Sequence, residues 1–541
     1  MTSSLQSLSV MSLRRLVLAA VAASGSLSAV SAGRVQKPDL VLPSDAPTHQ
    51  QEVVDIFSKS YEAYKQYAFG HDDLTPLNNS FYDGRNGWGA SMADALDTMF
   101  LMGRNDWFEE AVAHFANIDF SRSVTNDTTS VFETTIRYVG GFLSAYELSG
   151  KTQHVLVEKA QQIADQLVYA YVGDNAIPFG HLNFTDHQSV KDTSNVAEAG
   201  TLTLEWNRLS QYTGNDTYRQ LAEKSVKYMM GLPTPVNGIP PQGIDPATGK
   251  SVGSYITWGG GTDSYIEYLI KYPRLTNTDD QSYADTWLTA VDTSIQTLLR
   301  NSTVGNHLYL AEQDKGKLSH VGSHLACFHG GNWILGGKLL NNDTIVNYGL
   351  QLTDACLNTY ASTATGIGPE VFAFISDDGD YVEGSSGVNS TQKAFYDQHG
   401  FYITDPTYDL RPEVLESNFY AYRVTGDEKY LKVAAAAIES IKNYINTTNA
   451  YAPITDVMDT NSPRINDMES FWFAEVLKYL FLTFDAPEKV SLDDFVFNTE
   501  CHPFIAPAAL PKYGSGNLMA PSNQPVTTND GSIPVPSPKP F

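Results

Sequence analysis

The chain has 541 residues, of which 42% are hydrophobic and 11% aromatic, so it can bury a sizeable core. Its formal net charge of −26 and pI near 4.7 exclude a general affinity for nucleic acid or anionic membranes, which requires clustered Lys and Arg. Cations and neutral ligands are the expected partners.

The first 32 residues have the features of a signal peptide. Arg14 and Arg15 precede the apolar run LVLAAVAA (residues 16–23), and VSA at residues 30–32 suits signal peptidase. The run is far shorter than the ~20 apolar residues that span a bilayer. We therefore expect a mature protein that begins near Gly33, has no membrane anchor, and is secreted or kept in the lumen of the secretory pathway.

Eight N-x-S/T sequons agree with a secretory route. Single sequons occur often by chance, but eight together are harder to dismiss. The candidate N-glycosylation sites are Asn78, Asn126, Asn183, Asn215, Asn301, Asn342, Asn389 and Asn446.

Apolar residues recur at helical spacing through most of the chain between residues 51 and 484. Several segments share an order of helix, glycine and second helix, in which Gly150, Gly214 and Gly426 are placed to adopt left-handed backbone after a helix end. About fourteen helical segments would pair into about seven hairpins. Seven hairpins can close into a ring, and a solenoid is the competing arrangement.

The last stretch, residues 511–541, is rich in Pro, Ser, Gly and Asn. This composition predicts a disordered tail. We expect one catalytic domain over residues 33–510, and a monomer.

The three cysteines are Cys327, Cys356 and Cys501. An oxidising compartment favours one disulfide, and Cys327 with Cys356 is the sequence-local pairing, worth ~3–4 kcal/mol in the chain-entropy model. Cys501 would then be free. The alternative of three buried thiols is less common in a secreted chain.

Four carboxylate-rich segments carry the candidate chemistry. They are DALDT (94–98), VFETTIR (131–137), GGGTDSYIEYL (259–269) and LRPEVLES (410–417). Glu133 and Arg137 lie four residues apart, so on a helix they share a face, as an orienting ion pair or as an ordinary surface salt bridge.

The other acids stand at helix starts. Asp263 follows a glycine-rich loop, where a helix cap is the common role. Glu413 follows Pro412, and Glu416 falls on nearly the same face, so this pair needs a cation, a proton or water between the two carboxylates. Paired carboxylates without a Ser-His-Asp pattern or a phosphate loop favour glycoside hydrolysis.

Seven motifs resemble those of the class I α-1,2-mannosidases, glycoside hydrolase family 47, and follow in family order from about residue 50 to residue 505. They are DALDTMFLMG, FETTIRYVGGFLSAYELSG, DSYIEYLIK, SHLACF, LRPEVLESNFYAYRVTGD, MESFWFAEVLKYLFLTF and FVFNTECHPF. The resemblance implies an all-α (α/α)7 barrel that uses one Ca²⁺ ion. It would remove terminal α-1,2-linked mannose, with inversion, from high-mannose N-glycans on glycoproteins or as free oligosaccharides. The secreted fungal members are the most similar.

The resemblance also implies roles for single residues. Glu133 matches the general acid, which acts directly or through a water, and Glu413 matches a proposed general base. Asp263 matches a third essential carboxylate. Inversion requires room for a water, so the acid and base carboxyls should lie ~6.5–9.5 Å apart or more.

In the family, the Thr of FNTE gives its carbonyl and hydroxyl oxygens to Ca²⁺, and here that residue is Thr499. Glu416, Glu475 and Glu500 match carboxylates that hold waters around the ion. Zn²⁺ at Cys501 and His502 is the weaker hypothesis, because two adjacent residues do not supply a tetrahedral ligand set.

Further residues match positions around the family's substrate or in its barrel. Arg137, His324, Arg411, Phe471 and Glu475 are the substrate-binding candidates. Asp94 matches an acid of the barrel core, for which a structural role is the simpler reading, and Cys327 with Cys356 matches the family's disulfide.

The chain departs from the family pattern at two positions. Cys501 stands where Ala is usual. Gly261 stands where members that trim a single mannose carry Arg, so we expect removal of several mannoses.

Two other functions compete with hydrolysis of mannosides. A lectin-like relative would bind high-mannose glycans for glycoprotein quality control with little hydrolysis, and it would need the same pocket. A barrel hydrolase acting on another polysaccharide would not need the calcium-linked FNTE motif.

Overall fold

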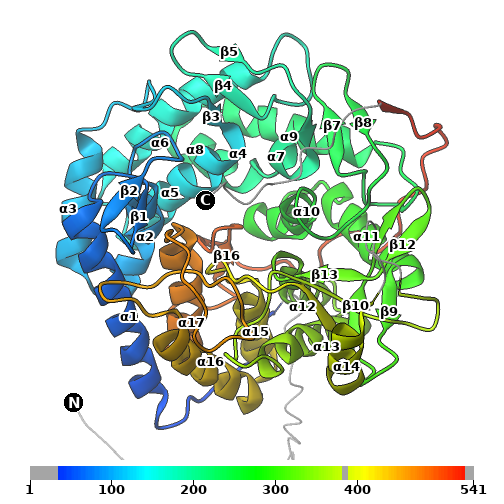
Figure 1. Ribbon diagram of the computed structural model, residues 1–541. Coiled ribbons are helices and arrows are strands. Elements are labelled where there is room, and N and C mark those ends of the chain that lie inside the picture. Colours follow the sequence, from blue (N-terminus) through cyan, green and yellow to red (C-terminus); the bar gives the residue numbers. More distant parts are fainter. Residues whose placement is uncertain (1–33, 381–387, 530–541) are drawn as a thin grey trace, which may run out of the picture. The chain divides into compact units, whose positions relative to one another are not determined.

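Residues 34–380 and 388–529 are described by a computed structural model (Figure 1), so the predicted signal peptide lies outside the described residues. In this part of the chain two concentric rings of helices dominate. The inner ring consists of α2 (Ala90–Leu101), α5 (Gly140–Leu148), α8 (Thr203–Thr213), α10 (Asp263–Thr276), α12 (Phe328–Leu339), α15 (Glu413–Thr425) and α17 (Leu477–Phe484). The outer ring consists of α1 (Ala46–Tyr67), α3 (Asn105–Ala116), α6 (His154–Leu167), α9 (Thr217–Met230), α11 (Ser282–Thr297), α13 (Asp343–Ala361) and α16 (Glu428–Ser440).

The double ring is closed. Each inner helix contacts the next one along the chain, and the π-helical turn η5 (Trp472–Val476), which leads into α17, packs back on α2. The first outer helix, α1, packs on the last inner helix, α17. A solenoid would leave these two ends apart, so the predicted (α/α)7 barrel is confirmed.

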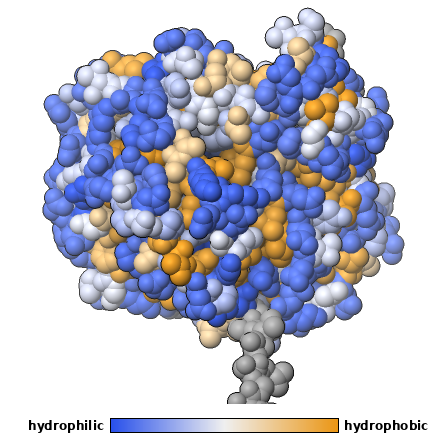
Figure 2. Space-filling view, turned by 90° about the horizontal axis from the view of Figure 1, so that it is seen from below, coloured by the Kyte–Doolittle hydropathy of each residue, from blue (hydrophilic) through white to orange (hydrophobic). Residues whose placement is uncertain are grey.

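The burial pattern separates the two rings. Every residue of α12 except Lys338 is buried, as expected for an inner helix surrounded by other helices. The outer helix α6 buries Leu156, Ala160, Ile163 and Leu167, which are three or four residues apart on one face. The face of the molecule shown in Figure 2 mixes hydrophilic and hydrophobic residues.

The predicted helix ends at glycine are confirmed. Gly214 and Gly426 follow α8 and α15 with φ of 70° and 66°, and Gly150 lies just beyond α5 with φ of 69°. Glycine has no Cβ to resist this left-handed backbone, so the chain turns there into the partner helix of each hairpin.

Short helices complete the described chain. They are α4 (Val131–Thr134), the π-helical η1 (Thr135–Val139), η2 (Val168–Ala170), α7 (Val196–Gly200), η3 (Leu325–Cys327), α14 (Ser390–His399) and the π-helical η4 (Ile441–Ile445). None of the helices in the described ranges is both long and apolar enough to cross a membrane.

Short antiparallel sheets join the helical pairs. The pairs are β1 (Asp73–Thr75) with β2 (Ser80–Tyr82), β9 (Leu299–Asn301) with β10 (Leu308–Leu310), β11 (Glu312–Asp314) with β12 (Lys317–Ser319), and β16 (Phe495–Phe497) with β17 (Pro503–Ile505). Two sheets have three strands, β3 (Thr129–Ser130), β4 (His181–Asn183) and β5 (Gln188–Ser189), and β13 (Val321–Ser323), β14 (Val371–Ala373) and β15 (Tyr402–Asp405). One sheet has four strands, in the order β18 (Thr528–Asn529), β8 (Lys250–Val252), β7 (Gly243–Asp245) and β6 (Ser194–Asn195), with β18 parallel to β8.

The β16–β17 hairpin lies against the inner helices α5 and α10. At its turn, the Asn498 side chain donates to the carbonyl of Ile136 at 2.9 Å and to the Glu205 carboxylate at 2.8 Å. Lys478 donates to the carbonyl of Cys501 at 2.7 Å. These bonds hold the turn, which carries Thr499, inside the ring.

The predicted disulfide is confirmed. Cys327 at the start of α12 is bonded to Cys356 on the partner helix α13, with Cα atoms 6.0 Å apart. Cys501 is free and buried.

The predicted disordered tail is described as far as Asn529, and the prediction for residues 530–541 lies outside the described residues. Up to that point the tail contacts the barrel. Tyr513 is only 2% exposed, and β18 extends the sheet of β8.

The hairpin is also anchored by a fully buried charge network, which we expect to set the acid stability of the barrel. Asp97 accepts from Lys478 and His502, each at 2.8 Å. Burial alone would raise the pKa of Asp97, but these two partners lower it to about 2. Because the folded pKa lies below the unfolded value, this stabilisation is complete above pH ~4 and is lost as the pH falls toward 2.

We predict that the ionised Asp97 contributes about 2 kcal/mol to the free energy of unfolding at neutral pH. Asp97→Asn should lower that free energy by at least this amount at pH 7 and by much less at pH 2, measured by denaturant unfolding. Asp174→Asn, at an exposed position, is the matched control. An equal loss at both pH values would contradict the assignment.

Candidate active site

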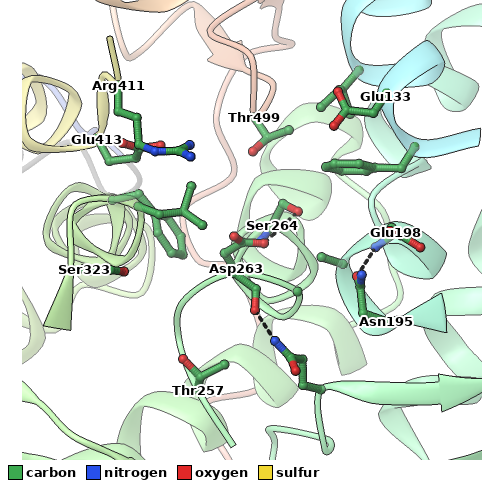
Figure 3. Close-up of a pocket in the computed structure, with 18 of the residues that line it drawn as sticks. Glu133, Asn195, Glu198, Thr257, Asp263, Ser264, Ser323, Arg411, Glu413 and Thr499 are labelled. Carbon is green, nitrogen blue, oxygen red and sulfur yellow. Dashed lines mark hydrogen bonds between the residues drawn. The ribbon is translucent and has the colours of Figure 1, made fainter. Parts of the chain in front are cut away.

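A cavity of about 1320 Å³ opens at the centre of the ring. Nearly all the site residues predicted from the sequence line this cavity. Those that line it are Glu133, Arg137, Asp263, Arg411, Glu413, Glu416, Phe471, Glu475, Thr499 and Glu500. Figure 3 shows Glu133 and Glu413 on opposite sides of this cavity, with Thr499 between them.

Glu133 is held by two arginines. Ser130 caps its short helix by accepting from the Glu133 amide, and a π-helical segment follows that carries Arg137. Arg137 Nε lies 2.6 Å from Glu133 Oε2, and Arg85 Nε lies 3.6 Å from the same oxygen. Burial would raise the pKa of Glu133, but Arg137 and then Arg85 lower it below its usual value. The side chain is still 36% exposed, so this ion-paired carboxylate faces the cavity.

Arg137 connects Glu133 to the hairpin. Its Nη1 lies 2.8 Å from Glu500 and 3.4 Å from Asp94, and its guanidinium lies 5.6 Å from the centre of the Phe471 ring. The predicted ion pair of Glu133 and Arg137 is thus a buried network and not a surface salt bridge. Asp94 itself is fully buried and also contacts His502 at 3.3 Å, which agrees with a structural role.

Glu413 occupies the first turn of α15, as its position after Pro412 predicts. Its Oε2 contacts Nδ1 of His324 at 2.8 Å. Burial would raise the pKa of Glu413, but His324 and then Arg411 lower it, so the ionised form is favoured. Arg411 is in turn fixed by Glu370 at 2.5 Å.

His324 does not line the cavity, contrary to its expected contact with substrate. Its side chain is buried behind Glu413, and its second ring nitrogen lies 2.7 Å from the Tyr360 hydroxyl. A residue enclosed in this way is positioned to orient the Glu413 carboxylate.

Asp263 begins α10 beneath the glycine-rich loop, and Ser264 donates its backbone amide to it at 2.7 Å. Burial, and to a smaller extent the charges of Glu267 and Glu413, raise the pKa of Asp263 to about 7. Of Glu133, Asp263 and Glu413, Asp263 is therefore the one whose surroundings favour the protonated form, whereas those of Glu133 and Glu413 favour the ionised form.

The floor of the cavity gathers buried carboxylates around Thr499. Burial and the charges of Glu500, Glu413 and Glu416 raise the pKa of Glu475 well above its usual value. A divalent cation would relieve this crowding, and oxygen-rich surroundings suit a hard ion. Within the described ranges no three His, Cys, Asp or Glu side chains converge as direct ligands. The donor set therefore fits an ion held by Thr499 oxygens and by waters that the glutamates bind.

The positions of Cys501 and His502 do not support a metal site at these two residues. Both ring nitrogens of His502 contact carboxylates, Asp97 at 2.8 Å and Asp94 at 3.3 Å. These contacts anchor the hairpin and leave no ring nitrogen for a metal.

Sequence reasoning missed Arg85, Glu370 and Glu469. Arg85 donates to Glu469 at 2.7 Å and to Asp73 at 3.0 Å while it faces Glu133. The contact between Arg85 and Glu469 joins residues 384 positions apart, which no local pattern reveals. The glycine-rich segment GRNGWG just before the DALDT motif was the available signal for Arg85.

The chain is similar to known proteins along most of its length. The sequence model of the family described as glycosyl hydrolase family 47 matches residues 56–506. Mannosyl-oligosaccharide alpha-1,2-mannosidase 1B of Aspergillus phoenicis is 39% identical over 489 residues, covering 86% of this chain and 93% of the relative. The protein of the same name from Aspergillus oryzae is 38% identical, covering 83% and 91%. The solved structure of an alpha-1,2-mannosidase from Trichoderma reesei matches with a TM-score of 0.81 and 39% identity, over 85% of this chain and 99% of that one.

We predict that Glu475→Gln stabilises the metal-free protein. Because the folded pKa of Glu475 is raised, its ionisation costs folding free energy as the pH rises above ~4.5, by about 1.4 kcal/mol for each pKa unit. In excess chelator at pH 8, thermal unfolding of the variant should occur at a higher temperature than that of the wild type. A lower melting temperature for the variant than for the wild type would contradict the unfavourable burial of the Glu475 carboxylate.

Proposed function

Because the chain belongs to glycosyl hydrolase family 47, it is a glycosidase, and we propose that it removes terminal α-1,2-linked mannose from high-mannose N-glycans, on glycoproteins or as free oligosaccharides. The observation that carries this proposal is the arrangement of Glu133, Asp263, Glu413 and Thr499 around one cavity. A hydrolase needs a proton donor and a base on two sides of a sugar, and this cavity offers carboxyl groups on both.

Glu413 is the proposed base. His324 and Arg411 favour its charged form, and a carboxylate accepts a proton from a water only when it is ionised. Attack by that water on the face of the sugar opposite the leaving oxygen would invert the anomeric centre.

The proposed proton donor is Glu133, acting through a water, as the family resemblance implies. In the free protein Arg137 and Arg85 favour its charged form, so it must acquire a proton as the sugar enters and displaces solvent. Asp263, with its pKa of about 7, is the second candidate because it already holds a proton near neutral pH.

The proposed cofactor is Ca²⁺. Thr499 would hold it, and Glu416, Glu475 and Glu500 would bind the waters of its shell. When bound, the ion would accept hydroxyl oxygens of the terminal mannose and so fix the sugar ring. Arg137, Arg411 and Phe471 would position the same sugar, since both guanidinium groups lie within 6 Å of the Phe471 ring centre.

We also propose trimming of several mannoses. Gly261 has φ of 81°, and a Cβ placed there would lie 2.7 Å from the Gln242 side chain. The absence of a side chain leaves the cavity wall open for different branches.

A secretory location and a monomeric state are part of the same proposal. None of the eight sequon asparagines is buried, so each is open to glycosylation.

The proposal predicts the products of a direct assay. Purified protein should convert a high-mannose N-glycan to a ladder of products lacking one, two and more mannoses, followed by mass spectrometry. Excess chelator should stop the reaction, and added Ca²⁺ should restore it. Tight glycan binding without release in any condition would mean a lectin, and release unaffected by chelator would contradict the cofactor.

Substrates with different leaving groups separate the two proton donors. In α-mannosyl fluoride the leaving group is fluoride, which departs without needing a proton from an acid. Glu133→Gln should therefore lose about 10²-fold or more in kcat on α-1,2-mannobiose but little on the fluoride. Glu413→Gln should lose activity on both. If Asp263→Asn shows the selective loss and Glu133→Gln does not, the donor is Asp263.

A further inference from the structure

The chain continues past the family-matched region, which ends at residue 506, and stays on the barrel. We call residues 511–529 the C-terminal strap. Its first anchor is Tyr513, whose hydroxyl donates to Asn277 at 2.9 Å and accepts from the Leu510 amide at 3.0 Å. Asn277 ends the inner helix α10, so the strap starts from a fixed point of the barrel.

The second anchor is a buried carboxylate on α11. Asp285 is 7% exposed, and its Oδ1 accepts from the amides of Ser515 at 2.8 Å and Gly516 at 3.2 Å. Its Oδ2 accepts from the Ser515 hydroxyl at 2.6 Å. Gly514 adopts φ of 70°, and a Cβ there would lie 2.8 Å from Asp285 Oδ1. A carboxylate bonded in this way by three donors of the strap is a built docking site.

Beyond this anchor the strap crosses to the β6–β7–β8 sheet. The amide of Met519 donates to Thr289 on α11 at 2.8 Å, and its carbonyl accepts from Asn237 at 2.7 Å. The strap then ends as β18, which pairs in parallel with Ser251 and Val252 of β8. In Figure 1 the red segment follows the outside of the ring near α11 and reaches β8.

The other side of this sheet forms a wall of the active-site cavity. Asn195 of β6, Gln242 just before β7 and Ser254 just after β8 all line it. The Gln242 side chain donates to the carbonyl of Gly260 at 2.5 Å, so the sheet also supports the loop that carries Gly261. Movement of the sheet would therefore move this wall of the cavity.

We propose that the C-terminal strap is a specificity-determining element, which clamps α11 to the β6–β7–β8 sheet and so positions the cavity wall for the branched part of the substrate. This inference rests on the proposed function. The strap contributes none of the residues that line the cavity, so it acts through Asn195, Gln242 and the Gly261 loop. It should affect binding of large glycans more than the chemistry on the terminal mannose.

Three variants test the strap. One ends at Leu510 and lacks it, and the matched control ends at Asn529 and keeps it. Gly514→Val retains the whole chain but sets a side chain against Asp285. Hydrogen exchange of residues 243–255, and kcat and KM on α-1,2-mannobiose and on a high-mannose oligosaccharide, are measured for each.

Loss of the strap should accelerate exchange of residues 243–255 and raise KM for the branched oligosaccharide about tenfold, with kcat and the values for mannobiose changed by less than about threefold. The control should match the full chain, and Gly514→Val should resemble the chain that ends at Leu510. Unchanged exchange, or an equal loss on both substrates, would overturn the inference. If the full chain cleaves neither substrate, the proposed function fails, while the exchange data still decide whether the strap holds the sheet.

Discussion

The catalytic end of the barrel depends on a group of buried carboxylates gathered around the tip of one hairpin. Glu416, Glu475 and Glu500 face the same cavity as Thr499, and burial raises the pKa of each. Without a cation, this arrangement opposes folding above pH ~4.5, because burial and neighbouring negative charge disfavour the ionised forms that these groups take in the unfolded chain. Packing elsewhere in the barrel must offset this unfavourable free energy. A cation that binds the folded chain would stabilise it and reduce the cost.

Two features of the barrel hold this group in place. The hairpin is fixed from below by Asp97, Lys478 and His502, all fully buried. From the side, Arg137 bridges Glu500 to Glu133, and so links the floor of the cavity to its wall. The same arginine therefore orients the Glu133 carboxylate and neutralises part of the negative charge of Glu500.

The three proposed catalytic carboxyl groups differ in the direction of their pKa shifts. Glu133 and Glu413 each have cationic or hydrogen-bonding partners that favour the charged form, whereas Asp263 lacks a cation of this kind and is dominated by burial. The pKa of each group thus follows from its neighbours, which come from different turns of the ring. Acid and base catalysis requires one group that is protonated and another that is ionised. Carboxyl groups with different pKa values in one cavity meet this requirement.

Much of this fold was predictable from local pattern. Helical periodicity and the glycines at 150, 214 and 426 indicated hairpins, because both act within a few residues of the chain. The closure of the ring, by contrast, depends on contacts between α1 and α17, at opposite ends of the domain.

Site residues were predictable where they lie in sequence motifs, but not where their positions depend on contacts between distant parts of the chain. Family motifs located Glu133, Glu413 and Thr499, but the burial of His324 behind Glu413 follows from packing across the ring. The strap has the composition of a disordered segment. Its order comes from a partner, Asp285, more than 200 residues away in the sequence.

Calorimetric titration of the metal-free protein with Ca²⁺ tests the proposed calcium site at Thr499 most directly. We predict one ion per chain, and an affinity reduced at least about tenfold by Thr499→Val, which removes the hydroxyl oxygen and keeps the shape of the side chain. An absence of binding heat at any temperature, or an affinity that the substitution leaves unchanged, would contradict the account.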